Sequence, residues 1–425
     1  MIEMSNPRDV VLSCIDSSSN EIVDFLQKLI SYPSVTGNEK DIQVFISNWL
    51  KDRLGITVDV WEPDLHELRR QPGYVPVDRD YKNRPNVVGL YKGQGSGHSL
   101  LFNGHVDVIP TGPEDLWQTN PWSGTMRDGK IFGRGASDMK AGLAAYTMAM
   151  HAIIVSGFKL KGDVILEYTV DEELSGNGTL ATITRGYTAD AGISGETSSM
   201  NVQPACIGRI WYEIHVKGKP AGIQRQWEGV NAIDKGYLVV KSVSEFQEER
   251  MKRITHHLYP NIRETIPCLV GVFQAGSYPS AFPDSCLLRG SMATVPGEDS
   301  DRVKKELAEH LKSSTSPDTW LRENPPAIKY TGYFAEPSEI PVDHDIVKSL
   351  KSAYETALGV TPSVSGRTGA ADIRFLNKYA HTPSVIFGPG PTDQMHATNE
   401  YARIDDLIAA TKVYALTILD WCGIT

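Results

Sequence analysis

The chain has 425 residues, a formal net charge of −10 and a hydrophobic fraction of 40%. A chain of this length is long enough for two domains, and its hydrophobic fraction is typical of globular proteins. The negative charge argues against nucleic acid or an anionic membrane surface as a partner. We therefore expect neither nucleic acid nor a membrane among its partners.

The cysteines and the N-terminal segment indicate the compartment. The cysteines are odd in number and none belongs to a closely spaced pair: Cys14, Cys206, Cys268, Cys286 and Cys422. This pattern is typical of reduced cytosolic thiols rather than of a disulfide framework. Residues 1–16 lack the basic start, apolar run and cleavage site of a secretory signal, and the longest apolar stretch, 141–155, is too short to span a bilayer. We expect a soluble, cytoplasmic protein.

The first half of the chain alternates between helical and strand-like patterns. Apolar residues recur at helical spacing in 21–31, and Thr36 and Glu39 form a capping-box signature ahead of a second helix over 40–54. A third helix is expected from about 138 to 156. Strand-like runs occupy 57–61, 86–91, 99–103, 163–170 and 191–194. This order predicts an α/β fold with helices on the faces of a sheet.

The pattern changes at about residue 209 and changes back after 334. The segment between has strand-like runs at 211–216, 268–273, 286–294 and 327–334 and helical periodicity at 230–252 and 301–313. Two helices on a short antiparallel sheet make a compact α+β module. An α/β pattern resumes at 344–358. We therefore expect a domain over 209–334 that is inserted into a first domain formed by 1–208 and 335–425.

One long segment, 64–85, has no periodic pattern. It is rich in arginine, tyrosine, proline and aspartate. An irregular stretch of this length inside a compact domain is usually either functional or disordered. We expect it to form a loop that borders the active site.

Five short segments, far apart in the sequence, each end a predicted strand or open a helix with a metal-binding residue. They are NGHVD at 103–107, GASDMK at 135–140, DEE at 171–173, GET at 195–197 and MHATNE at 395–400. They offer two imidazoles and several carboxylates, which are the usual ligands of zinc and also suit manganese or cobalt. This set can hold two divalent ions and leave one carboxylate as a base. It predicts metal-assisted hydrolysis.

The five segments, in this order, resemble the family of acetylornithine deacetylases, succinyldiaminopimelate desuccinylases and aminoacylases (metallopeptidase family 20), which are co-catalytic dinuclear metallohydrolases. The resemblance covers nearly the whole chain and is most specific in 101–142 and 388–400. It implies a zinc-exopeptidase-like catalytic domain with a mixed, mostly parallel sheet and helices on both faces. The inserted domain would be a lid and dimerisation domain.

The resemblance also implies residue roles and two divalent ions per subunit, zinc, manganese or cobalt. One ion would be held by His105, Asp138 and Glu196 and the other by Asp138, Glu173 and His396, so that the aspartate bridges. Glu172 would be the general base and acid, and Asp107 would support His105 through a hydrogen bond to its carboxylate. A cis peptide bond is expected between Asp138 and Met139.

The sequence departs from the family pattern in the inserted domain. Members usually carry a histidine that reaches the active site of a partner subunit, but Gly222 stands at that position, and Ser280 replaces a usual asparagine. Removing one oxyanion donor typically costs about 2.7–4 kcal/mol, so a replacement donor or a different reaction is needed. Candidate replacements in the same domain are Arg225, His256, His257 and Tyr278.

The resemblance also points to residues that would bind substrate. Arg289 stands where members bind the carboxylate of the substrate, and a guanidinium meets a carboxylate with two parallel hydrogen bonds. Asp372 and Arg374 match a segment near the pocket, and Arg367 lies just upstream. The expected substrate-binding set is Arg289, Tyr278, Asp372, Arg374 and Asn399.

Three hypotheses for the function follow. The first is an amidohydrolase that removes an acyl group from an N-acyl amino acid or a similar small amide. The second keeps the metal site but hydrolyses a non-peptide C–N bond of an aromatic or heterocyclic substrate, as an aromatic amine aminohydrolase or a formamide deformylase would. The third, a non-catalytic binding protein, fits poorly because Glu172 and the ligands are intact. We expect a small-molecule substrate and a homodimer formed through the inserted domain.

Overall fold

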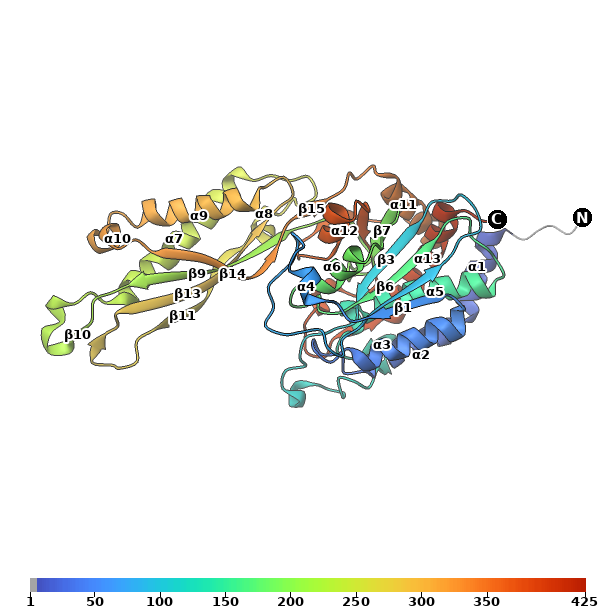
Figure 1. The fold of residues 1–425 in the computed structure, drawn as a ribbon, viewed down its shortest axis with the longest axis horizontal. Coiled ribbons are helices and arrows are strands. Elements are labelled where there is room, and N and C mark those ends of the chain that lie inside the picture. The colour runs from blue at the N-terminus through green and yellow to red at the C-terminus, as the bar shows by residue number, and fades with distance from the viewer. Residues whose placement is uncertain (1–5) are drawn as a thin grey trace, which may run out of the picture. The chain divides into compact units, whose positions relative to one another are not determined.

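The computed structural model describes residues 6–425. The chain folds into two compact units (Figure 1). The first contains the chain up to Ala205 together with Glu339–Arg367 and Ala371–Thr425, and the second contains Cys206–Ser338 with Thr368–Ala370. In the sequence, the second unit is therefore an insertion in the first.

The first unit is built on a nine-stranded sheet in the order β1-β2-β6-β3-β7-β17-β8-β15, with β16 paired to β8. Its strands are β1 (Thr57–Trp61), β2 (Asn86–Tyr91), β3 (Leu100–His105), β6 (Val164–Thr169), β7 (Ala191–Ser194), β8 (Val202–Cys206), β15 (Ser338–Glu339), β16 (Val364–Arg367) and β17 (Ser384–Ile386). The central strands β6, β3, β7 and β17 run parallel, whereas the pairs β1–β2, β2–β6 and β17–β8 are antiparallel. The expected mixed sheet is confirmed, with its parallel part at the centre.

Helices cover both faces of this sheet. Phe102 and Leu101 are neighbours in β3, so their side chains point to opposite faces. The ring of Phe102 lies 5.5 Å from that of Tyr146 in α5 (Ala141–Val155). Leu101 packs in a separate cluster with Leu376 of α12 (Ile373–Tyr379). Because both faces are covered, every residue of β3 is buried, as is usual for parallel strands.

The other helices of the first unit lie around this sheet (Figure 1). They are α1 (Pro7–Ser17), α2 (Ser19–Ile30), α3 (Lys40–Trp49), α4 (Leu65–Leu68), α6 (Asn177–Thr184), α11 (Asp345–Leu358) and α13 (Ile404–Cys422), with the short turns η1 (Leu50–Leu54), η2 (Glu114–Leu116), η3 (Ala136–Lys140) and η5 (Thr392–Gln394). A small sheet contains β4 (Thr125–Arg127), β5 (Lys130–Phe132) and β18 (Tyr401–Arg403). The helix expected from 138 begins instead at Ala141, because Asp138 and Met139 have non-helical backbone angles.

The capping box expected at Thr36 and Glu39 does not form. Glu39 precedes α3 but its side chain makes no capping hydrogen bond. Instead, Glu39 Oε1 accepts a hydrogen bond from Arg84 Nη2 (2.6 Å), and the Thr36 hydroxyl donates to Asp107 Oδ2 (2.9 Å). Glu39 Oε1 also accepts a local hydrogen bond from the N–H of Gly37 (3.0 Å), so tertiary contacts have displaced the capping box without removing every local contact.

The second unit is an antiparallel sheet with two long helices. Its main strands, β9 (Gly208–Lys217), β11 (Cys268–Ala275), β13 (Ser285–Thr294) and β14 (Ala327–Ala335), are arranged in the order β11-β13-β9-β14. The long helices are α7 (Ala232–Arg253) and α9 (Ser300–Ser314), and the smaller elements are β10 (Ala221–Gly222), η4 (Ile223–Glu228), α8 (Ile262–Thr265), β12 (Ala281–Phe282) and α10 (Thr319–Glu323). The expected α+β module with an antiparallel sheet is confirmed.

Strand β9 shows how the sequence builds this unit. Tyr212 and Ile214 are buried in one core cluster with Val243 of α7 and Leu307 of α9. Trp211 alternates with them and is half exposed. Full burial of an apolar side chain of this size contributes about 1.5–3 kcal/mol, so the period-two pattern decides which face of the sheet packs on the helices.

Two further observations concern the whole described chain. All five cysteines are free thiols. Within residues 6–425, no helix combines the length and the apolar character that crossing a membrane requires. The cytoplasmic location stays a prediction.

Candidate dinuclear metal centre

The metal-binding residues predicted from the sequence gather at the carboxyl ends of the central parallel strands. His105 is the last residue of β3, Glu173 follows β6 and Glu196 follows β7. Asp138 lies in η3, directly before α5, and His396 follows η5. In open α/β sheets this edge is where ligands bind, because the strand ends and the loops that follow them meet there.

These five residues form two groups that share Asp138. The groups are His105, Asp138 and Glu196, and Asp138, Glu173 and His396, and within each the candidate ligand atoms lie within 4.8 Å of one another. Asp138 Oδ1 lies 3.3 Å from His105 Nε2, and Asp138 Oδ2 lies 3.4 Å from His396 Nε2. A carboxylate that turns one oxygen toward each group has the geometry of a bridging ligand. Two adjoining groups of imidazole and carboxylate ligands fit two divalent ions.

The charge balance of the two groups favours a cation. Burial alone would lower the pKa of His105, but hydrogen bonds to Asp138 and Glu196 raise it well above its ordinary value. Hydrogen bonds to Asp138 and Glu173 raise the pKa of His396 to about 10. Burial acts to raise the pKa of Asp138, yet the two imidazoles hold it well below its usual range. The carboxylates therefore attract positive charge, and metal ions compete with protons for these ligands.

Glu172 lies beside the two groups. Its Oε2 is 3.8 Å from His105 Nε2, and its side chain is only 12% exposed. Burial raises the pKa of Glu172 well above its ordinary value, and the charges of Asp372 and Glu196 act in the same direction. A carboxyl group with a raised pKa holds a proton more readily than an ordinary carboxyl group, which suits a general base that must later return the proton as an acid.

Asp107 supports the site differently from the sequence-based expectation. Its main-chain carbonyl, rather than its carboxylate, accepts the hydrogen bond from His105 Nδ1 (2.8 Å). The carboxylate accepts hydrogen bonds from the main-chain N–H groups of Glu172 (3.1 Å) and Glu173 (3.3 Å). One residue therefore fixes the tautomer of a metal ligand and also orients the turn that carries the base.

Glu400 holds the turn that carries Asp138, a role that the sequence analysis did not assign. Its Oε1 accepts a hydrogen bond from the main-chain N–H of Asp138 (3.0 Å), and its Oε2 accepts from Gly135 N–H (2.9 Å) and Arg134 Nη1 (2.7 Å). The peptide bond between Asp138 and Met139 is cis, as expected. The only signal for Glu400 in the sequence was its place in the closing motif.

Arg367 orients a second ligand. It ends β16, is 7% exposed, and its Nη2 lies 3.1 Å from Glu196 Oε2. The other oxygen, Glu196 Oε1, is left 3.3 Å from His105 Nε2. The guanidinium of Arg367 thus fixes which oxygen of Glu196 faces His105.

Comparisons with known proteins identify the family of the chain. The model of Peptidase family M20/M25/M40 matches residues 101–420. The chain belongs to this family. The N-formyl-4-amino-5-aminomethyl-2-methylpyrimidine deformylase of Halalkalibacterium halodurans is 30% identical to it over 436 residues, which cover 97% of each chain. The Bacillus subtilis protein of the same name is 29% identical over 433 residues, which cover 96% of each.

A solved structure shows the shared fold. It is a dinuclear metal binding peptidase of the M20 family from Bacillus subtilis, with a TM-score of 0.66 and 15% identity, and the match covers 96% of this chain and 99% of that one. The chain is thus a metal-binding hydrolase of the M20 family, as the sequence resemblance implied.

Three of the expected substrate-binding residues of this M20 hydrolase lie in the first unit. Their side chains make hydrogen bonds to other residues of the chain. Asp372 Oδ2 accepts a hydrogen bond from the Thr179 hydroxyl (2.6 Å), and Arg374 Nη2 donates to the carbonyl of Ser175 (3.0 Å). Asn399 Oδ1 accepts from the main-chain N–H of Gln118 (2.6 Å). These contacts brace the loops at the site, and direct substrate binding by these residues stays a prediction.

The other two expected substrate-binding residues lie in the second unit. The Arg289 side chain is 49% exposed, and its Nε donates to Glu213 Oε1 (2.7 Å). Tyr278 lies between β11 and β12 and is 68% exposed. Their roles in substrate binding also stay predictions.

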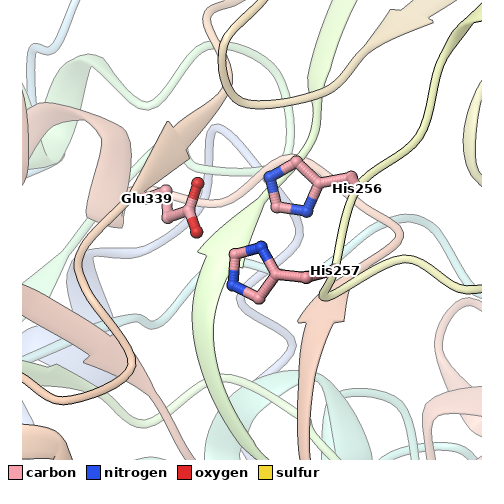
Figure 2. A group of neighbouring side chains, drawn as sticks. All are labelled: His256, His257 and Glu339. Carbon is pink, nitrogen blue, oxygen red and sulfur yellow. The ribbon is translucent and has the colours of Figure 1, made fainter.

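Gly222, where other M20 proteins are expected to carry a histidine, does not need to be glycine. Its φ of −73° is open to any residue. A Cβ added there would come no closer than 3.4 Å to another atom. Of the expected replacements, Arg225 forms an ion pair with Glu228 (2.7 Å), and the rings of His256 and His257 stack with centroids 4.9 Å apart (Figure 2). The backbone therefore permits a histidine that the sequence lacks.

Proposed function

We propose that this M20 hydrolase is a deformylase that cleaves the amide C–N bond of a formamide carried by an aminomethyl group on a pyrimidine or a similar heteroaromatic ring. One observation carries the proposal: the match, at 30% identity over 97% of the chain, to a protein named as a deformylase of such a compound. Two groups of candidate metal ligands, which such a reaction would use, support the proposal. This is the second of the hypotheses derived from the sequence.

The residues of the chain supply the proton transfers of this reaction. When bound, two divalent ions would lower the pKa of a water molecule and polarise the formyl carbonyl. Glu172 takes a proton from the water while the oxygen of the water forms a bond to the formyl carbon. The C–N bond then breaks, and Glu172 returns the proton to the leaving nitrogen. The products are formate and the amine, which takes up the proton that formic acid gives up.

The proposal includes two divalent ions per subunit, held by His105, Asp138, Glu173, Glu196 and His396. Two ligand groups that share one aspartate support it. Zinc, manganese and cobalt all suit imidazole and carboxylate ligands. Elemental analysis of the purified protein, followed by removal of metal and addition of each ion in turn, would identify the ion that restores activity.

The test of the reaction uses two matched panels of substrates. The first contains the N-formyl and N-acetyl derivatives of the same heteroaromatic aminomethyl amines, and the second contains N-formyl, N-acetyl and N-succinyl amino acids. We expect formate release from the formamides of the first panel and little turnover in the second. Turnover confined to the second panel would overturn the proposal and favour an amino-acid deacylase.

We also propose a homodimer formed through the second unit. Strand β11 is an edge of its four-stranded sheet, and Leu269 on this strand is 50% exposed. Tyr237 of α7 is 67% exposed, and its ring lies 5.4 Å from that of Phe273 on β11. An open edge next to exposed apolar side chains suits pairing with a second copy. Analytical ultracentrifugation should give a dimer mass for the native chain and a monomer mass for Leu269→Lys.

A further inference from the structure

A buried cluster of four residues holds the turn that carries Glu172, and the reaction described above does not use it. The cluster consists of Glu39, Tyr81, Arg84 and Asp171, all in the first unit. Their exposed fractions are 0%, 2%, 3% and 0%. Tyr81 and Arg84 come from the segment 64–85, which has no periodic pattern, and Asp171 directly precedes the base.

The arginine joins the two carboxylates of the cluster. Arg84 Nε and Nη2 donate to Glu39 Oε2 (2.8 Å) and Oε1 (2.6 Å), which is a bidentate ion pair. Arg84 Nη2 also donates to Asp171 Oδ1 (2.9 Å). The other oxygen, Asp171 Oδ2, accepts a hydrogen bond from the Tyr81 hydroxyl (2.8 Å). Both oxygens of Asp171 are therefore tied to the segment 64–85.

The backbone conformation of Asp171 explains why these side-chain contacts are needed. Its φ of +66° lies in the left-handed region, which residues other than glycine adopt uncommonly. Its carbonyl accepts the N–H groups of Ser175 (3.1 Å) and Gly176 (2.8 Å), which closes the turn. The side-chain contacts of Asp171 hold this conformation from one side. From the other side, the carboxylate of Asp107 holds the N–H of Glu172.

The charges of the cluster make the arginine hard to replace. Two buried carboxylates share one guanidinium, and a buried carboxylate that loses its partner is strongly destabilising. A lysine carries a single compact ammonium group, which cannot reproduce the fork that Arg84 presents to Glu39 while it contacts Asp171. Lysine should therefore keep the charge of the site and lose its geometry.

We infer that Arg84 and Tyr81 are positioning residues for the reaction. Through Asp171 they fix the turn from which Glu172 reaches the reacting water. The segment 64–85 thus acts on catalysis by bracing the base from within the protein. The inference rests on the proposed function, because it takes Glu172 as the base.

The test compares Arg84→Lys and Tyr81→Phe with a matched control. Arg250 is also fully buried and pairs with a glutamate, Glu298 (2.6 Å), but in the second unit, so Arg250→Lys makes the same chemical change at another ion pair. For each variant, kcat and KM are measured on the best substrate of the two panels, together with metal content. Hydrogen exchange over residues 170–177 is measured on protein without added metal.

We expect kcat of Arg84→Lys to fall by about 10–100-fold while KM and metal content stay at the native level, because a small misplacement of a catalytic group costs this much. Exchange over residues 170–177 should quicken while the rest of the first unit stays protected. Tyr81→Phe should show the same pattern with a smaller loss of kcat. If Arg84→Lys does not fold, Tyr81→Phe alone tests the inference. Arg250→Lys should keep native kcat and native exchange in this segment.

The inference is overturned if the folded variants keep native kcat, or if their metal content falls in proportion to their activity. Glu172→Ala, measured in the same assay, separates this failure from failure of the proposed function. If turnover survives in Glu172→Ala, Glu172 is not the base, and the proposed mechanism is wrong. If turnover is lost in Glu172→Ala but stays native in Arg84→Lys and Tyr81→Phe, only the positioning role of Arg84 and Tyr81 is contradicted.

Discussion

The two units of the chain differ in how firmly they hold the residues assigned to function. In the first unit, Asp138 and Glu196 are buried, and Glu400 and Arg367 hold them in place. In the second unit, by contrast, the expected substrate-binding residue Tyr278 is largely exposed. A buried, braced site must keep its chemistry, whereas exposed positions can change at little cost in stability. The candidate metal ligands Asp138 and Glu196 are therefore constrained by burial, whereas Gly222, where the family resemblance predicts a histidine, lies at an exposed position.

The largest effect is expected when the proposed base, Glu172, is replaced and the five proposed metal ligands are kept. In Glu172→Ala we expect turnover to fall by about 10²–10⁴-fold, because general acid–base catalysis contributes this much. Metal content should stay native, since the five ligand side chains remain. Elemental analysis and kcat measured on one preparation check both statements. A parallel loss of metal would mean that Glu172 is a ligand.

The two histidines should respond differently although both are proposed as ligands. The side chain of His105 is 1% exposed and that of His396 is 51% exposed. We expect His105→Ala and His396→Ala each to lose metal and turnover. Without metal, only His105→Ala should unfold at markedly lower temperature than the native chain, because it leaves a cavity and buried carboxylates without a partner. Thermal unfolding in the presence of a chelator measures this, and equal melting temperatures would contradict it.

The sequence could bring the candidate metal ligands together because each belongs to a short motif, and His105, Glu173 and Glu196 lie at or after the ends of parallel strands, which converge. Their role as ligands stays a prediction. The bracing contacts were not predictable, because they join residues far apart in the sequence. Glu39 and Arg84 are 45 positions apart, and the local pattern around Glu39 predicts a capping box instead. Asp107 shows a second limit: spacing places the residue, but it does not tell whether its carbonyl or its carboxylate faces His105.

Glu167 tests how the buried unit responds to pH. It is fully buried in β6, where Asn103 Nδ2 donates to its Oε2 (2.9 Å), and burial raises its pKa from 4.5 to about 7. A carboxyl with a raised folded-state pKa contributes stability that is present below pH 4.5 and lost as the pH rises through 7. By pH 8 this loss amounts to about 3 kcal/mol in the free energy of unfolding.

Glu167→Gln should remove this pH-dependent loss. Urea unfolding at pH 5 and pH 8 should therefore show the variant gaining on the native chain as the pH rises. Glu213→Gln, on the outward face of β9, is the matched control and should leave the change between these pH values as it is in the native chain. An unchanged pH response in Glu167→Gln would show that Glu167 is ionised in the fold.

The smallest effect is expected at Arg289 in the second unit. Its partly exposed ion pair with Glu213 should contribute little to the free energy of unfolding, because solvent screens it, so the stability of Arg289→Ala should be close to that of the native chain. A formamide on a neutral heteroaromatic amine offers no carboxylate to this guanidinium, so its kcat and KM should stay native. Any slow turnover of N-acyl amino acids should instead show a raised KM, because those substrates carry a carboxylate that Arg289 can bind. A raised KM for the formamide would assign Arg289 to the substrate site despite its exposure. It would also show that an exposed residue of the second unit takes part in the reaction, against the contrast between the two units.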